Sequence, residues 1–214
     1  MKLILLVTAF LSFQAAFSSD FGEALMHANN GNAIAQSNLG VMYENGLGVP
    51  EDHVEAVNWY RKAAEQGDVL AQSNLAFMYA NGRGVLKDAA EAVGWYRRAA
   101  EQGGVDGQFS LGVMYAKGEG VSENDFEAVR WYRKAAEQGD AGAQSNLGSM
   151  YAIGDGVSKN MLKAYAWWSL AKSQGDSAAM QNVAVLRHRM SAKEIAIAKA
   201  LATRCYKSGY VDCD

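Results

Sequence analysis

Proline and cysteine are scarce in this sequence of 214 residues, which has one proline and two cysteines. Proline interrupts helix interiors, so its scarcity is compatible with long helices. Alternating polar and apolar runs, typical of half-buried strands, are also scarce, while alanine-rich stretches are frequent. These absences favour an all-α fold. Half of the residues are hydrophobic, which is enough to bury a sizeable core.

A basic block is missing as well. The chain has 20 Lys+Arg against 23 Asp+Glu, and both signs are mixed along it. Nucleic acid and anionic membrane surfaces are therefore not expected partners. The three histidines, His27, His53 and His188, lie in different contexts and offer neither a catalytic triad nor a zinc site. We expect no cofactor.

The N-terminus has the pattern of a secretory signal peptide. Lys2 is the only charged residue in 1–19, and residues 3–13 are almost entirely apolar. Small residues follow, so we predict a signal peptide at 1–18 with cleavage after Ser18, and Ala16 as the alternative. An apolar run of about 11 residues is shorter than the roughly 20 that a membrane span needs. We therefore expect a periplasmic or secreted protein without stable membrane insertion.

An internal repeat of 36 residues organises the rest of the chain. Residues 31–66 and 67–102 match at 23 of 36 positions, and two further units follow at 103–138 and 139–174. Glycine recurs with the same spacing at Gly31, Gly67, Gly103, Gly139 and Gly175. Such self-similarity is typical of stacked repeat architectures.

Each unit predicts two helices separated by a glycine loop. In the first unit a helix begins after Asn32 and ends at the pair Gly46 and Gly48. Glycine suits this helix end because it tolerates the positive φ that a tight turn needs. The second helix begins at Asp52, with Glu55 placed for a reciprocal capping box. In the units that follow, the first helix has its N-cap at Asp68, Gly104, Asp140 and Asp176. The second helix has its N-cap at Asp88, Asn124 and Asn160. Two helices are predicted to start less firmly. One has Gly104 at its N-cap, and the other has Lys163 in place of the glutamate.

Alanine and aromatic residues alternate on the second helix of each unit. In the first unit the stripe is Ala56, Trp59, Tyr60 and Ala63, and its spacing favours a helical core over a cofactor box or base-stacking platform. One helix pair cannot bury both of its faces, so the units must stack. The predicted fold is an α/α superhelical solenoid of stacked helix–loop–helix repeats.

The pattern A-Q-S-N-L-G-V-M-Y-x-N-G-x-G-V, followed by D-x-x-E-A-V-x-W-Y-R-K-A-A-E-Q-G, resembles the Sel1-like repeat. This family is related to the tetratricopeptide repeat, and the resemblance covers residues 31–174 fully. It implies an adaptor for a protein or peptide partner, often in bacterial envelope signalling or host interaction. We favour a Gram-negative bacterial source and a monomer on this analogy.

The two ends depart from the repeat. Residues 19–30 predict a short N-terminal capping helix. Residues 175–214 predict a half-repeat, then a capping helix at about 192–207 that begins with a Ser191/Glu194 capping box and ends at Gly209.

Both cysteines, Cys205 and Cys213, lie in this C-terminal tail. In an exported protein two nearby cysteines predict a disulfide, and Gly209 lets the chain fold back for closure. Two free thiols or an intermolecular bond are the alternatives. Some Sel1-like proteins have a disulfide within every helix pair, whereas the repeats of this chain have none.

If the first helices line a concave face as in the tetratricopeptide relatives, five residues are candidates for partner binding. Asparagine offers a donor and an acceptor to a peptide backbone, and phenylalanine can anchor an apolar side chain. The alternatives are that the asparagines bond a neighbouring helix and that the phenylalanines are packing residues. The candidates are Asn38, Asn74, Phe77, Phe109 and Asn146.

One motif suggests chemistry. Ser169 and Lys172 form S-x-x-K, the nucleophile motif of serine β-lactamases, and cysteine-rich Sel1-like proteins have been linked by name to that activity. The partner motifs S-D-N and K-T-G are missing from the sequence. We therefore predict a non-enzymatic scaffold and keep a β-lactamase-like hydrolase as the alternative.

Overall fold

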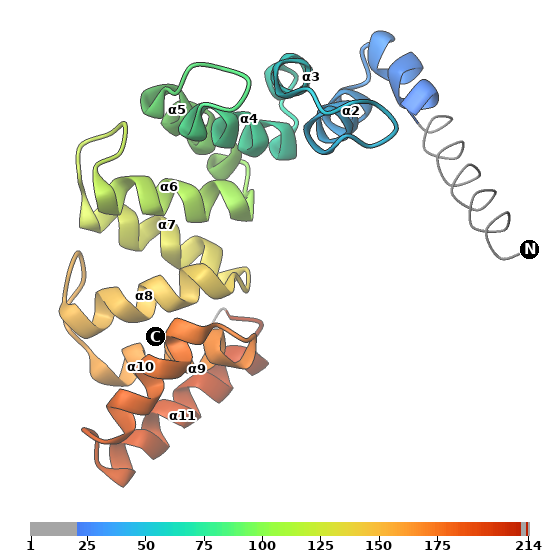
Figure 1. Ribbon diagram of the computed structural model, residues 1–214. Helices are drawn as coiled ribbons and strands as arrows, with labels where there is room; N and C mark the ends of the chain where they lie inside the picture. Colours follow the sequence, from blue (N-terminus) through green and yellow to red (C-terminus); the bar gives the residue numbers. More distant parts are fainter. Residues whose placement is uncertain (1–20, 211–212, 214) are drawn as a thin grey trace, which may run out of the picture. The chain divides into compact units, whose positions relative to one another are not determined.

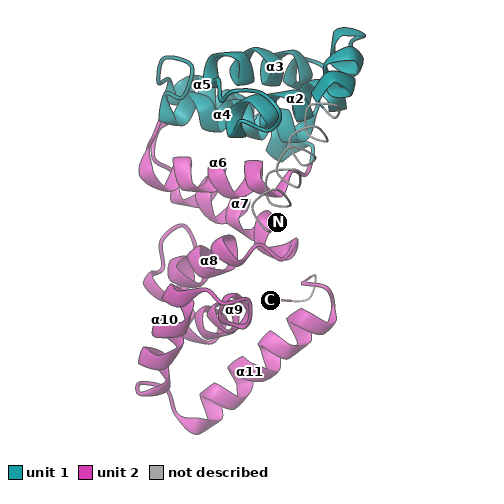
Figure 2. Cartoon of the chain, turned by 45° about the vertical axis from the view of Figure 1, so that its right-hand side comes forward, with its two compact units in different colours: residues 1–102 teal, residues 103–214 magenta. Residues whose placement is uncertain are grey.

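The computed structural model describes residues 21–210 and 213 (Figure 1). Within these residues every regular element is a helix, which confirms the predicted fold class. The chain divides into two compact units, residues 1–102 and 103–214 (Figure 2), and each is described by itself. The predicted signal peptide at 1–18, its cleavage site and the first two residues of the predicted cap lie outside the described residues.

Unit 1 contains the N-terminal cap and the first two repeats. Residues 21–29 are helical, as the capping prediction requires. The repeats follow as two helix pairs, and each helix packs on the next one along the chain. The helices are α2 (Ala33–Asn45), α3 (His53–Glu65), α4 (Val69–Asn81) and α5 (Ala89–Glu101).

Unit 2 contains the other two repeats and the C-terminal extension. Its helices α6 to α9 repeat the pairing of unit 1, and α9 then contacts both α10 and α11. The last helix is therefore held against the final repeat and has the length predicted for it. The helices are α6 (Val105–Lys117), α7 (Asp125–Glu137), α8 (Ala141–Ile153), α9 (Met161–Ser173), α10 (Ser177–Arg187) and α11 (Ala192–Lys207).

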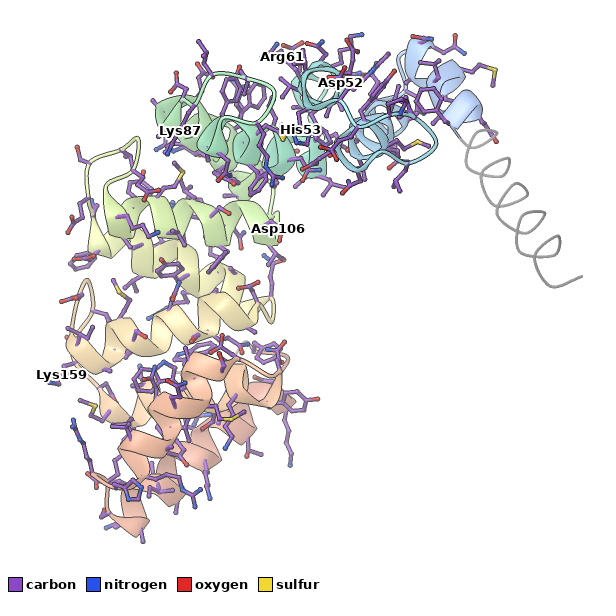
Figure 3. The ribbon with its side chains drawn as sticks, in the orientation of Figure 1. Asp52, His53, Arg61, Lys87, Asp106 and Lys159 are labelled. Atoms are coloured by element: carbon purple, nitrogen blue, oxygen red, sulfur yellow. A yellow bond between two sulfur atoms is a disulfide. The ribbon has the colours of Figure 1, made fainter. Side chains whose placement is uncertain are left out.

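The predicted N-caps begin the helices as expected. The Asn32 side chain accepts a hydrogen bond from the backbone N–H of Ala35, and Asp52 accepts from the N–H groups of Val54 and Glu55 at the start of α3 (Figure 3). Gly104 gives α6 no side-chain cap, as predicted. Asn160 still caps α9 with two hydrogen bonds despite Lys163.

The reciprocal half of the capping box at the second helices is a wrong prediction. The backbone N–H of Asp52 donates to the carbonyl of Tyr43 (2.9 Å), and Asp88 donates in the same way to Tyr79 (2.9 Å). The end of the first helix therefore already accepts the hydrogen bond of the N-cap N–H group. The glutamate three residues on is left without an N-cap donor. Only the last helix, α11, has the reciprocal box at its start among the described helices.

The glycine loops close tightly over the preceding repeat. Gly84 has φ +64°, and a Cβ at this position would collide with the backbone carbonyl of His53 in α3. In unit 2, Gly156 (φ +63°) approaches the carbonyl of Asp125 in the same way. Gly84 and Gly156 are thus required both by their backbone conformation and by the close approach of two repeats.

The predicted stripe of alanine and aromatic residues forms the core. Ala56, Tyr60 and Ala63 are completely buried, and Trp59 is 7% exposed. A pair of glutamines, one exposed and one buried, adds a polar tie inside each repeat: the Gln66 amide donates to the side chain of the buried Gln36 (2.7 Å). The sequence reasoning missed this tie, which recurs as Gln102–Gln72, Gln138–Gln108 and Gln174–Gln144.

Candidate functional site

Two of the candidate asparagines are hydrogen-bonded to a neighbouring helix. Asn74 of α4 bonds the Tyr60 hydroxyl in unit 1, and Asn146 of α8 bonds the Tyr132 hydroxyl in unit 2. The Tyr60 hydroxyl also donates to Glu44 (2.6 Å). These are the contacts expected if the asparagines bond a neighbouring helix.

Burial dominates the chemistry of the two tyrosines. Desolvation raises the pKa of Tyr132 to about 12, and the hydrogen bond from Asn146 opposes this in part. Burial also raises the pKa of Tyr60, as do the hydrogen bond and negative charge of Glu44. Both hydroxyls are therefore neutral at physiological pH.

Asn38 of α2 is exposed. With Asn32, Ile34 and residues of the capping helix, it lines a shallow depression of about 490 Å³. The capping helix contributes Glu23 and His27 to this depression. Asn38 therefore remains accessible for a partner.

Phe77 and Phe109 occupy different environments. Phe77 of α4 is 40% exposed, and the Arg83 guanidinium lies 5.3 Å from its ring centroid. Arg83 also approaches Glu44 (3.8 Å). In unit 2, Phe109 of α6 is half-buried and its ring centroid lies 6.1 Å from that of Tyr132. Phe77 is thus the better anchor for a partner, and Phe109 takes part in packing.

Arg83 lies beside Phe77, although the sequence did not mark it as a candidate for partner binding. It lies between Gly82 and Gly84, where the other loops have Leu47, Glu119 and Asp155. That variability inside a fixed glycine frame is the signal that could have identified it. Together Phe77, Arg83 and Glu44 give unit 1 an exposed ring with a cation over it and a carboxylate beside it.

The S-x-x-K motif lies within α9. The Ser169 hydroxyl donates to the carbonyl of Tyr165 one turn earlier (2.7 Å), and its side chain is half-buried. Bonds of this type are common for serine inside helices. Nothing in this geometry favours the hydrolase alternative.

Cys205 and Cys213 form a disulfide, and both side chains are buried. The chain folds back after α11 at Gly209 (φ +68°) and Tyr210 (φ +67°), whose backbone N–H donates to the Cys205 carbonyl (2.8 Å). Such a bond fits an extracellular or periplasmic protein. Among the residues with described positions, no grouping of His, Cys, Asp and Glu could hold a metal ion. None of the described helices is long and apolar enough to cross a membrane.

The comparison with protein families matches the Sel1 repeat four times, at residues 33–68, 69–104, 105–140 and 141–176. The chain therefore belongs to the Sel1 repeat family. These bounds start two residues later than the units read from the sequence. Sel1 repeats form a solenoid that is typically a non-enzymatic scaffold and generally mediates protein–protein interactions.

Solved structures agree with this assignment. The chain is similar to c5321, a protective antigen of uropathogenic Escherichia coli, with 33% identity over 91% of this chain and a TM-score of 0.78. It is also similar to a Sel1 repeat protein from Oxalobacter formigenes, with 37% identity over 78% of this chain and a TM-score of 0.72. The immunity protein Pa5087 of Pseudomonas aeruginosa, at 22% identity over 97% of this chain and 82% of its own length (TM-score 0.50), shares the fold alone.

The chain spans 45% of the E. coli protein and 66% of the O. formigenes protein. Curated proteins gave no match.

Proposed function

We propose that this chain is an exported scaffold that binds a peptide or protein on the face formed by the first helices of its repeats. The observation that carries the proposal is Phe77, a large aromatic side chain that remains 40% exposed on a first helix, whereas the tryptophan and tyrosine side chains of the second helices are buried. An exposed ring held beside a cation is a typical anchor for a partner side chain. Asn38, which is exposed, and Asn74, which is half-buried, supply polar contacts in the same unit.

Export is part of the proposal. The pattern at residues 1–18 and the disulfide both support a periplasmic or secreted location in a bacterium. The E. coli protein that the chain resembles is a protective antigen, and we take this as further support. We propose a monomer that does not bind nucleic acid and that releases the signal peptide near Ser18.

The test is affinity capture from the native bacterial envelope with the purified chain, both oxidised and reduced. We expect a reproducible protein partner whose recovery falls with Phe77→Ala. The matched control is Leu86→Ala, which removes the more exposed side chain of a neighbouring loop (89% exposed). No reproducible partner would argue against the scaffold, and capture that is unchanged by Phe77→Ala and by Phe109→Ala would reject the site alone.

A further inference from the structure

The C-terminal segment has a charge balance unlike the rest of the chain. Residues 187–207 contain six lysines and arginines and one carboxylate, Glu194. That carboxylate accepts hydrogen bonds from the backbone N–H (2.8 Å) and hydroxyl (2.7 Å) of Ser191 in the α11 capping box. The one acidic side chain of the segment is thus already engaged at the start of its own helix.

Helical periodicity collects part of this charge on one side of α11. Lys193, Ile197, Ala200, Arg204 and Lys207 follow one another at intervals of four and three residues, which places them along one stripe. All five side chains are exposed, and Ile197 is 47% exposed. We call these five residues the α11 stripe. The opposite side of α11 is buried through Ala198, Ala202 and Cys205.

Residues at the beginning of α9 lie beside the α11 stripe and form a groove with it. Leu162 and Lys163 of α9 line a depression of about 450 Å³ together with Ile197, Leu201 and Arg204 of α11. Figure 2 shows α11 in unit 2 with α9 beside it, and the two helices are in contact. The groove therefore has an apolar floor with cations at its edge.

A second depression continues this groove along α11. It is lined by Ala200, Arg204 and Lys207, with Thr203 and Ser208, and shares Ala200 and Arg204 with the first. From Lys193 to Lys207 the stripe extends about 21 Å at 1.5 Å per residue. An extended peptide of roughly seven residues covers that length at about 3.3 Å per residue.

We infer that this groove is a second interaction surface, separate from the first-helix face, and that its occupant is an acidic segment of a partner protein. An apolar side chain of the segment packs against Ile197 and Leu162, and its carboxylates meet Arg204 and Lys207. Charge complementarity selects the occupant, because the described residues that line the two depressions include Lys163, Arg204 and Lys207 and no aspartate or glutamate. A lipid surface fits less well, since Ile197 and Ala200 give the stripe too little apolar area for membrane insertion.

The direct test is fluorescence anisotropy of a labelled peptide with the purified, oxidised chain. The probe has a leucine between glutamates and is about eight residues long, which covers the stripe when extended. We expect binding that weakens as salt rises, because the charges are exposed. Replacing the glutamates with lysines should abolish binding, and replacing the leucine with serine should weaken it.

The informative variant is Arg204→Gln/Lys207→Gln. We expect it to weaken binding roughly fivefold, since each exposed charge pair contributes a modest amount. The matched control, Lys172→Gln/Lys199→Gln, makes the same charge change at exposed positions of α9 and α11 that do not line the groove. Circular dichroism should show that both variants fold, because all four side chains are exposed.

Each opposing result rejects the inference. Equal binding of the lysine peptide, or equal loss in both variants, would indicate non-specific attraction. Binding to phosphatidylglycerol vesicles through Arg204 and Lys207, without binding of the glutamate peptide, would make the groove a lipid site. Self-association of the chain that Arg204→Gln/Lys207→Gln weakens, again without peptide binding, would make a second copy the occupant.

Discussion

Trp168 of α9 packs directly over the backbone of Gly148 in α8. A Cβ at Gly148 would lie 2.7 Å from Cδ1 of the indole, whose Nε1–H donates to the carbonyl of Ser145 (2.9 Å). Tyr60 lies over Gly40 and Tyr132 over Gly112 in the same way. The glycine inside a first helix is therefore the counterpart of the large aromatic residue in the second helix.

Gly148→Ala should destabilise the chain. The added methyl group forces the indole away from the helix and strains its hydrogen bond to Ser145, so we expect a loss of about 1–3 kcal/mol in the free energy of unfolding. Gly94→Ala is the control, because nothing lies within 4 Å of a Cβ at Gly94 in α5. It should stabilise by about 0.5–1 kcal/mol through helix propensity. Urea denaturation measures both, and equal effects of the two substitutions would contradict the close packing.

Helix capping predicts opposite effects at equivalent positions. Asp140→Ala removes the acceptor for the Ala143 N–H (2.6 Å) and should cost about 1 kcal/mol. Gly104→Asp should stabilise by a few tenths of a kcal/mol, since Asp is preferred to Gly at an N-cap. Gly104 (φ −61°, ψ 119°) already has the backbone conformation of Asp140 (φ −63°, ψ 119°). Thermal unfolding followed by circular dichroism tests the pair, and a loss of stability in Gly104→Asp would contradict this reasoning.

The raised pKa of Tyr132 predicts that the folded chain loses stability at alkaline pH. Its pKa is raised to about 12 in the folded chain, above the value of about 10 for an unfolded chain. The neutral phenol is therefore favoured by folding, and this contribution is complete below pH 10 and is lost as the pH rises from about 10 to 12.

Urea denaturation across this pH range measures the effect. Tyr132→Phe should make the free energy of unfolding fall less steeply, by up to about 1.4 kcal/mol per pH unit for one proton. At neutral pH the variant lacks the hydrogen bond from Asn146. Tyr206→Phe is the control for removal of one tyrosine, because that side chain is 64% exposed. A slope unchanged by Tyr132→Phe would contradict the burial argument.

Much of this fold could be read from the sequence because each signal is local. The caps Asn32 and Asp52, the glycine turns and the Ser191/Glu194 box act within a few residues, and the 36-residue spacing repeats them. The reciprocal box at Asp52 failed because its backbone N–H is satisfied by Tyr43, on another helix. A local motif cannot reveal a competitor that only tertiary structure supplies.

The candidate site was less predictable for the same reason. Asn74 and Asn146 lie at repeat positions that a solenoid could expose, but their bonds to Tyr60 and Tyr132 depend on how consecutive helices cross. The α11 stripe was also hidden. Its cations are spread over many residues without forming a block, and only the helix brings Lys193, Arg204 and Lys207 to one side.

The disulfide between Cys205 and Cys213 should stabilise the C-terminal helix. It closes a loop with a sequence separation of 8 residues, for which the chain-entropy model gives about 2–3 kcal/mol. Cys205 is on the buried side of α11 and Cys213 is buried as well, so the bond ties the C-terminal tail to the end of that helix. Reduction should therefore lower the midpoint of urea denaturation, with helical signal lost first from the C-terminal part of the chain.

The variant Cys205→Ser/Cys213→Ser separates the covalent bond from other effects of the reductant. It should unfold at the lower midpoint with or without reductant, whereas the unsubstituted chain should shift only when it is reduced. Hydrogen exchange should show faster exchange in α11 than in α9 for both the reduced chain and the variant, because α11 depends on the closed loop. Identical denaturation midpoints for the oxidised and reduced chain would mean that the bond contributes nothing to folding. A disulfide-linked dimer on a non-reducing gel would instead place the two cysteines in different chains.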